Sequence, residues 1–160
     1  MDYEGPVYLR LGRNPVPVVF DPEKYHFEIG KGIKVRNGKD ITLVATGTMF
    51  DVAVRSADKL AGEGIEAEVI NIPTIKPLDK NLIIESAKKT GRIIVLEEGI
   101  IVGGLGSAVS KLMSESCPVP MRYVGIEDCF GQSGDASELL EYYGLTVENT
   151  VAKAKELMQI

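Results

Sequence analysis

Two glycine-rich stretches and a pair of arginines have residue types and spacings that suit the binding of a charged ligand. The first stretch is ATGTMFD at residues 45–51. In open α/β sheets, ligands bind beyond the carboxyl ends of the strands, and a helix that starts there can hold an anion. Thr46, Gly47 and Thr48 are placed for that role. We favour the alternative, a tight strand-to-helix turn in which Thr48 is only the N-cap, because every doubly wound sheet needs such turns.

The second stretch, EEGIIVGGLGSA at residues 97–108, contains part of a dinucleotide-binding pattern. Gly104 and Gly106 form a G-x-G, but Val109 stands where the third glycine belongs. Five residues also separate Glu98 from Gly104, whereas a dinucleotide fingerprint opens directly after its strand. Nucleotide binding is therefore disfavoured. We expect these glycines to allow the close approach of a helix or a subunit.

Residues that could act in catalysis or hold a metal are few. Glu97 and Glu98 could form a general acid and base, or one could cap a neighbouring helix while the other is solvated. We favour the second interpretation. His26 is the one histidine and lies in an extended segment. Cys117 and Cys129 lack Cys-x-x-Cys spacing, so we expect buried small apolar residues and no metal site. No catalytic residue is assigned.

Arg10 and Arg13 lie on either side of the end of an opening strand-like run. A guanidinium at such a place can bind a phosphate or a carboxylate through two parallel hydrogen bonds. The alternative is a pair of solvated arginines in a linker.

The elements that must position these residues begin with an unusual N-terminal segment. Apolar residues alternate over GPVYLRLG, which predicts a strand with no earlier residues to pair with. Prolines then recur at positions 15, 17 and 22. Each removes an amide donor and favours extended geometry in the residue before it. Residues 13–27 are therefore predicted to form an extended linker and a domain boundary.

From residue 28 onward the pattern is that of an α/β domain. Asn37-Gly38 lies between two β-rich runs, which predicts a hairpin that pairs Gly32–Arg36 with Ile41–Ala45. Helical and strand patterns then alternate. Helices are predicted at 48–62, 80–90, 106–114, 137–143 and 147–158, and further strands at 66–72, 92–97 and 121–124. Asp79, Ser137 and Thr146 are the expected N-caps.

Strands separated by helices normally run parallel, with right-handed crossovers. The order therefore predicts a three-layer α/β/α sandwich around a mixed, mostly parallel five-stranded sheet. The first strand should be the antiparallel edge.

Composition narrows the class of protein. The 160 residues hold 18 Lys plus Arg against 23 Asp plus Glu, a net charge of −5. This balance argues against an electrostatic nucleic-acid binder. No apolar run approaches the ~20 residues of a membrane-spanning helix, and the start of the chain lacks a signal-peptide pattern. Two cysteines are too few for a disulfide scaffold. We expect a soluble cytoplasmic protein that binds neither nucleic acid nor membranes.

Motifs along the whole chain, in order, resemble a known family. They are GPVYLRLGRNP, IGKG, DITLVATGTM, EVINIPTIKPLD, IIVLEEGIIVGGLGSAV, GIEDCFGQSGDASELLEYYGLT and VAKAKEL. Together they closely resemble the C-terminal portion of transketolase. They are also similar to deoxyxylulose-phosphate synthase and to the beta subunits of 2-oxoacid dehydrogenases.

The resemblance implies an enzyme that transfers two-carbon ketol units between sugar phosphates in the pentose phosphate pathway. It implies thiamine diphosphate and Mg²⁺ in the assembled enzyme, but no cofactor in this chain, which is expected to be inactive alone. Residues 1–27 would be the end of a preceding pyrimidine domain plus a linker, and residues 28–160 the C-terminal domain. The expected partners are the remaining transketolase domains or an N-terminal subunit, in a homodimer.

The resemblance also suggests a role for one arginine. In the family, an arginine at the position of Arg13 binds the substrate phosphate, and Arg10 is a secondary candidate. Two other interpretations stay open, namely an interaction or dimerisation module of a related thiamine enzyme and a nucleotide-binding domain. Whether the chain is a segment of a longer protein or a separate subunit is also open, and the first is preferred.

Overall fold

A mixed five-stranded sheet forms the centre of the described residues, which are 3–12, 15–23 and 25–160 of a computed structural model. Its strands are β1 (Ile33–Arg36), β2 (Ile41–Ala45), β3 (Ala67–Asn71), β4 (Ile93–Ile100) and β5 (Met121–Ile126). Their spatial order is β1-β3-β2-β4-β5. β1 runs antiparallel to β3 at the edge, and the other neighbours are parallel. The predicted mixed sheet with an antiparallel first strand is confirmed.

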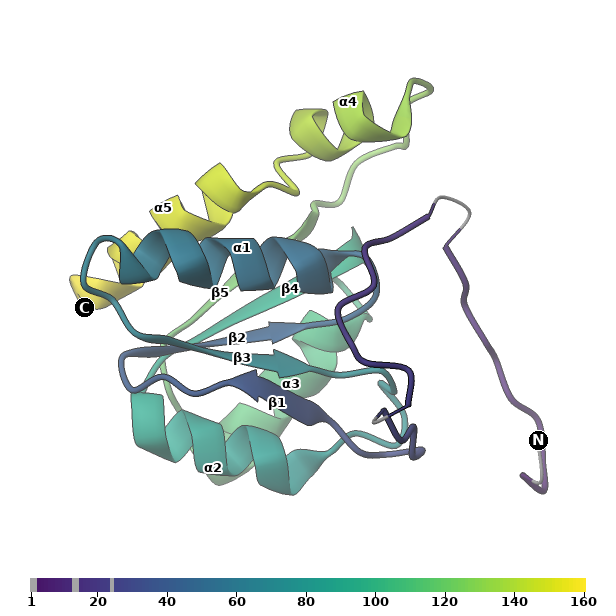
Figure 1. The fold of residues 1–160 in the computed structure, drawn as a ribbon, viewed down its shortest axis with the longest axis horizontal. Coiled ribbons are helices and arrows are strands. Elements are labelled where there is room, and N and C mark those ends of the chain that lie inside the picture. The colour runs from purple at the N-terminus through teal and green to yellow at the C-terminus, as the bar shows by residue number, and fades with distance from the viewer. Residues whose placement is uncertain (1–2, 13–14, 24) are drawn as a thin grey trace.

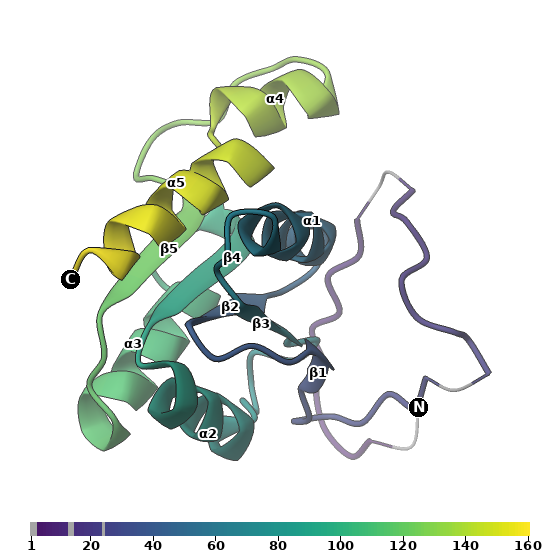
Figure 2. The same cartoon turned by 60° about the vertical axis from the view of Figure 1, so that its left-hand side comes forward.

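Helices cover both faces of this sheet (Figures 1 and 2). The helices are α1 (Met49–Ala61), α2 (Lys80–Thr90), α3 (Leu105–Ser116), α4 (Ala136–Tyr142) and α5 (Val147–Met158). α1 and α5 pack on one face and α2 and α3 on the other, which gives two separate hydrophobic clusters with the sheet between them. α4 lies away from the sheet and buries no side chain. The predicted three-layer sandwich is therefore present.

Several predicted helix ends are confirmed, and one is wrong. Asp79 caps α2 by accepting a hydrogen bond from the amide of Leu82 at 3.2 Å. Thr146 caps α5 through the amide of Asn149 at the same distance. Ser137 was the expected N-cap of α4, but Asp135 holds that position without a side-chain cap. The cause is a helix that starts one residue earlier than predicted, at Ala136.

The predicted hairpin between β1 and β2 is wrong, because β3 lies between these two strands. The chain crosses the beginning of β3, and the amides of Lys39 and Asp40 both donate to the carbonyl of Glu66 at 3.0 Å. A Cβ on Gly38 would lie 2.2 Å from backbone atoms of Ala67 and Glu68. Gly38 is therefore needed for this close crossing, and the dipeptide that suggested a hairpin serves a different geometry.

Glu68 is a charged side chain that is fully buried in β3. It pairs with Lys89 of α2, and its Oε2 lies 3.3 Å from Nζ of Lys34 on β1. Burial alone would raise the pKa of this carboxyl, but the two ammonium groups favour its charged form and hold the pKa below the ordinary 4.5. The pairs tie the edge strand and α2 to the middle of the sheet.

Glu68→Gln is expected to lower the free energy of unfolding at neutral pH by about 1–2 kcal/mol. The variant should also lose less stability than the native chain as the pH falls into the acid range. Because the pKa of Glu68 is lower in the folded state, its contribution is present above the unfolded value near 4.5 and is lost as the pH falls through the folded value. Urea midpoints measured from neutral pH to below 4.5 test this. Glu66→Gln, at an exposed pair with Lys39, is the control. Equal acid slopes in the native chain and Glu68→Gln would contradict the prediction.

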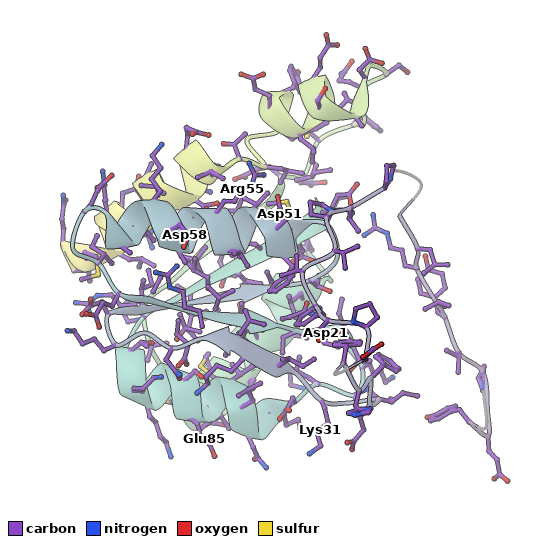
Figure 3. All side chains as sticks on the ribbon, viewed as in Figure 1. Asp21, Lys31, Asp51, Arg55, Asp58 and Glu85 are labelled. Carbon is purple, nitrogen blue, oxygen red and sulfur yellow. The ribbon has the colours of Figure 1, made fainter. Side chains whose placement is uncertain are left out.

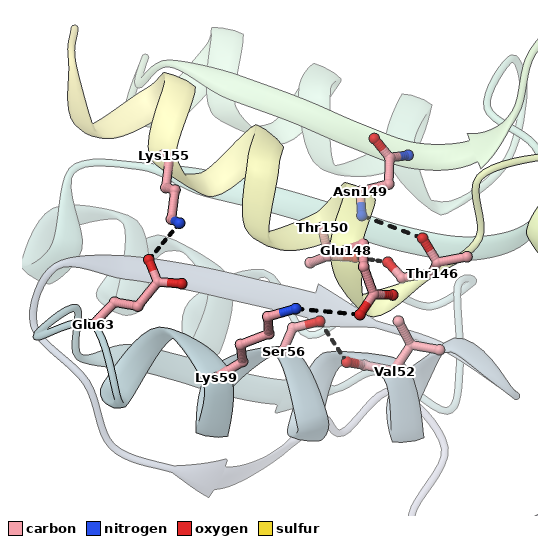
Figure 4. A network of polar contacts seen from close by, with 9 residues as sticks. All are labelled: Val52, Ser56, Lys59, Glu63, Thr146, Glu148, Asn149, Thr150 and Lys155. Carbon is pink, nitrogen blue, oxygen red and sulfur yellow. Dashed lines mark hydrogen bonds and ion pairs between the residues drawn. The ribbon is translucent and has the colours of Figure 1, made fainter.

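Polar contacts fasten α5 to α1 along their length (Figure 4). Lys59 lies 3.2 Å from Glu148 at the start of α5, and Lys155 pairs with Glu63 after the end of α1. The pKa of Glu148 is lowered, first by its own backbone amide and then by Lys59. These exposed pairs add little stability individually. They orient the two helices above the shared apolar cluster.

The N-terminal segment agrees only in part with the predicted strand and extended linker. Residues 3–12 form neither helix nor strand, and their apolar side chains are exposed, with Tyr8 90% and Leu11 77% accessible. The strand predicted there is not part of the sheet of this chain. The linker is not wholly unpacked, because the ring of Phe20 stacks on Phe50 of α1 with centroids 5.3 Å apart. This contact holds the linker beside the start of α1 (Figure 1).

Candidate functional site

The candidate site lies at the carboxyl ends of β2 and β4. β2 connects through α1 to β3 on one side, and β4 connects through α3 to β5 on the other. Adjacent parallel strands whose connections leave in opposite directions open a crevice at their carboxyl ends, the usual ligand position in such sheets. The loop at residues 45–51 and the end of β4 form the two sides of this crevice. The position predicted for Thr46, Gly47 and Thr48 is confirmed.

Three residues connect the two sides of the crevice to the N-terminal segment. The hydroxyl of Thr48 donates to Glu98 Oε2 at 2.6 Å. The guanidinium of Arg10 donates through Nη1 to the carbonyl of Glu98 at 2.7 Å. Thr48 stands at the N-cap position of α1, but its side chain makes no capping bond because it faces Glu98. The amides in the first turn of α1 therefore lack a side-chain acceptor from Thr48.

Glu97 has a structural role on the opposite face. It is 6% exposed, and its two carboxylate oxygens accept hydrogen bonds from the amides of Leu105 and Gly106, both at 2.8 Å. A Cβ on Gly104 would lie 2.0 Å from Glu97 Oε2. The favoured interpretation, in which one glutamate caps a helix, is confirmed for Glu97. Glu98 is half-buried and bonded to Thr48, so it is not the freely solvated residue that we expected.

A cavity of about 320 Å³ opens beside the crevice, between the linker and the start of α1. Its polar lining residues are Arg10, Thr46, Thr48, Asp51 and Asn71. Its apolar wall includes Val16, Pro17, Val19, Phe20, Phe50 and Pro73. Asp51 is paired with Arg55, Oδ2 to Nε 2.8 Å, and Figure 3 shows both side chains on α1. A site of this size and mixed lining suits a small molecule that carries one charged end.

The remaining predicted residues are placed as follows. Arg13 lies outside the described residues. His26 is exposed in the linker. Cys117 is half-buried and Cys129 is exposed, so the expectation of two buried cysteines is wrong, because Cys129 falls in the exposed loop after β5. Among the described residues, no three His, Cys, Asp or Glu side chains are grouped so that they could hold a metal ion.

Asn71 is the lining residue that sequence reasoning missed. It ends β3 and is 8% exposed. The sequence signal was an asparagine in the otherwise apolar run VINI, at the carboxyl end of a predicted strand. Its importance depends on the strand order, which places the end of β3 next to the end of β2.

The fold and this crevice define a doubly wound α/β domain with an added antiparallel edge strand. The model of the family described as transketolase, C-terminal domain, matches residues 30–150, and the chain belongs to this family. Among the described residues, none of the helices has the length and apolar character needed to cross a membrane.

Three related proteins show how far the similarity extends. The 6-deoxy-6-sulfo-D-fructose transketolase subunit of Clostridium sp. (strain MSTE9) is 45% identical over 98% of this chain and 48% of its own length. The 1-deoxy-D-xylulose-5-phosphate synthase of Heliobacterium modesticaldum (strain ATCC 51547 / Ice1) is 44% identical over 98% of this chain and 25% of its own length. A solved split gene transketolase, an inactive beta4 tetramer, superposes with a TM-score of 0.94 at 45% identity, covering 98% of this chain and 51% of that one.

The chain thus spans about half the length of its subunit relatives and a quarter of the synthase. The superposition that gives this TM-score covers nearly the whole chain. The described domain therefore has the same fold as the matching part of the solved relative.

Proposed function

We propose that this chain is the C-terminal part of a thiamine-diphosphate-dependent transketolase that transfers two-carbon ketol units between sugar phosphates. The observation that carries the proposal is 45% identity to a transketolase subunit over 98% of this chain. The pentose phosphate pathway and the cytoplasm are the proposed setting. Alone, the chain is inactive and contributes structure, assembly and a contact to the substrate phosphate.

The division of the chain follows from its N-terminal segment. We assign residues 1–27 to the end of a preceding pyrimidine domain plus a linker, and 28–160 to the C-terminal domain. Val7 and Leu9, 49% and 59% exposed, lie in a segment without a partner strand among the described residues. Unpaired backbone with apolar side chains is suited to joining the sheet of another domain. The partners are thus the remaining transketolase domains or an N-terminal subunit, in a homodimer.

The cofactor belongs to those partners. Thiamine diphosphate with Mg²⁺ would supply the chemistry that breaks and forms the bond to the two-carbon unit. The described residues offer no group of three metal-ligating side chains to hold the Mg²⁺. We therefore assign none of the described residues to the metal ion or to thiamine diphosphate.

The 160-residue chain is expected to show no saturable binding of thiamine diphosphate in the presence of Mg²⁺, measured by titration calorimetry. A longer chain that includes the preceding domains, or a mixture with the product of the gene directly upstream, should both bind thiamine diphosphate and transfer ketol units. Tight binding of the cofactor to this chain alone would overturn the assignment. An assembled protein that binds the cofactor but transfers no ketol unit from any sugar phosphate would overturn the proposed activity.

Arg13→Ala in the assembled enzyme is expected to raise the KM for phosphorylated acceptors, because charge-assisted bonds to phosphate contribute about 1.5–3 kcal/mol each, or 10- to 150-fold. The affinity for thiamine diphosphate should not change. Arg10→Ala, at the secondary candidate, should give a smaller rise in KM. Steady-state kinetics with phosphorylated and unphosphorylated acceptors measure both effects. Unaltered KM values on every phosphorylated sugar would exclude the contact.

A second candidate function is supported by the 44% identity to a 1-deoxy-D-xylulose-5-phosphate synthase, nearly equal to that of the transketolase subunit. In this case the chain would be the interaction or dimerisation module of a related thiamine enzyme, which includes the 2-oxoacid dehydrogenase beta subunits. Formation of 1-deoxy-D-xylulose 5-phosphate by the assembled protein, without ketol transfer between sugars, would favour it.

A further inference from the structure

We propose that the cavity between the linker and the start of α1 binds a small organic oxyanion, a carboxylate or phosphate monoester on a compact apolar body. The site uses only residues of this chain. It does not use Arg13, but Arg10, the secondary candidate for the phosphate contact, lines it.

Asn71 is the observation that points to a ligand. On β3, Ala67 and Val69 belong to the cluster under α1, whereas Ile70 belongs to the cluster on the other face. Since side chains alternate along a strand, Asn71 faces the α1 side, where it lines the cavity. The residue is only 8% exposed, and its side chain forms no hydrogen bond with any other described residue. Its amide atoms are open to the cavity, so their hydrogen-bond partner must be a ligand or water there.

The charge around Asn71 favours an anion. The guanidinium of Arg10 lines the cavity and is oriented by its bond to the carbonyl of Glu98. α1 begins at the same cavity, and the side chain at its N-cap, Thr48, is turned away to Glu98. The amide of Phe50 donates to the carbonyl of Gly47 at 3.2 Å, but no side chain caps this helix end, so the positive end of the helix dipole faces the cavity. Asp51, the one carboxylate among the described residues that line the cavity, is paired with Arg55.

The apolar residues on the opposite wall of the cavity favour a ligand whose remaining part is apolar. Phe20 stacks on Phe50, and both rings line the cavity together with Val16 and Val19 of the linker. A free inorganic ion would leave this apolar wall in contact with water. A molecule with an oxyanion at one end and a compact apolar body fills the volume of about 320 Å³ and covers both walls.

Titration of the 160-residue chain with phenyl phosphate and with benzoate tests the proposal, with amide chemical shifts as the readout. Saturable shifts at Thr48 and Asn71 are expected, and the tighter of the two probes identifies the head group. Benzyl alcohol, without the charge, and inorganic phosphate, without the ring, should each bind at least tenfold more weakly. No saturation by either charged probe, or inorganic phosphate binding as well as phenyl phosphate, would overturn the proposal.

Variants separate the site from general surface binding. Asn71→Asp has nearly the same shape but carries a negative charge that repels the anionic ligand, so it should abolish saturable binding. Asn71→Leu replaces it as the test variant if Asn71→Asp does not fold. Arg10→Met should weaken binding about tenfold by removing a charge-assisted bond. Arg36→Met is the matched control, since Arg36 pairs with Asp58, at the other end of α1 from Asp51 (Figure 3). Equal weakening by the control, or none by the site variants, contradicts the assignment. None of these results depends on thiamine diphosphate or on Arg13, so failure here leaves the proposed ketol transfer and the Arg13 contact untouched.

Discussion

Gly38→Ala is expected to destabilise the fold by at least about 3 kcal/mol, the upper range for forcing atoms into a packed site. The added Cβ would lie 2.2 Å from the backbone carbon of Ala67 and the backbone nitrogen of Glu68. Backbone atoms cannot rotate away as a flexible side chain does, so β3 or the crossing segment must move. That movement would stretch the bonds from Lys39 and Asp40 to the carbonyl of Glu66. Urea unfolding followed by circular dichroism measures the loss.

Gly131→Ala is the matched control for this prediction. Gly131 lies in the exposed loop after β5, and a Cβ there would meet no atom within 4 Å. The same substitution should then be neutral or slightly stabilising, because alanine loses less chain entropy on folding. Equal unfolding midpoints for Gly38→Ala and Gly131→Ala would show that the segment crosses β3 at a greater distance than the structure gives.

Glu97→Ala is expected to cost roughly 3–5 kcal/mol, since two charge-assisted hydrogen bonds are removed and two buried amides are left without an acceptor. Both carboxylate oxygens of Glu97 are engaged at 2.8 Å by the start of α3. The loss should appear as a lower unfolding midpoint. It should also appear as faster hydrogen exchange at Leu105 and Gly106.

Glu97→Gln gives the rescue test, because its amide oxygen keeps one acceptor and the shape of the side chain. We expect it to recover part of the lost stability. Glu115→Ala, at an exposed residue near the end of α3, controls for the loss of a negative charge. If Glu97→Ala and Glu115→Ala unfold at the same midpoint, the cap is not a significant source of stability.

Much of the fold could be predicted because local patterns decide it. The bounds of α2 and α5 follow from apolar periodicity with Asp79 and Thr146 as caps, and both helices occur as expected. The pairing of β1 could not be predicted in the same way. Asn37-Gly38 is a local signal for a hairpin, but the insertion of β3 next to β2 depends on packing across the whole sheet. The antiparallel direction of β1 was right although the predicted partner strand was wrong.

The candidate site was less accessible to sequence reasoning. Thr46 and Thr48 were located because strand ends next to helix starts are frequent ligand positions. The bond from Thr48 to Glu98 joins residues 50 positions apart, and the contact of Arg10 with the carbonyl of Glu98 spans 88. No spacing rule reaches over such separations. Asn71 has no motif at all, and its role depends on burial without a hydrogen-bond partner.

The linker that forms one wall of the cavity has a thermodynamic consequence. Val16, Val19 and Phe20 line the cavity from a segment that also leads to Arg13 and to the unpaired N-terminal residues. A ligand that bridges the linker and the sheet favours one linker position. If assembly with a partner domain favours the same linker position, ligand binding and assembly each raise the affinity of the other by the same factor. If assembly favours another linker position, each lowers the affinity of the other. The change in ligand affinity on assembly and the change in assembly affinity on ligand binding therefore report the same coupling free energy.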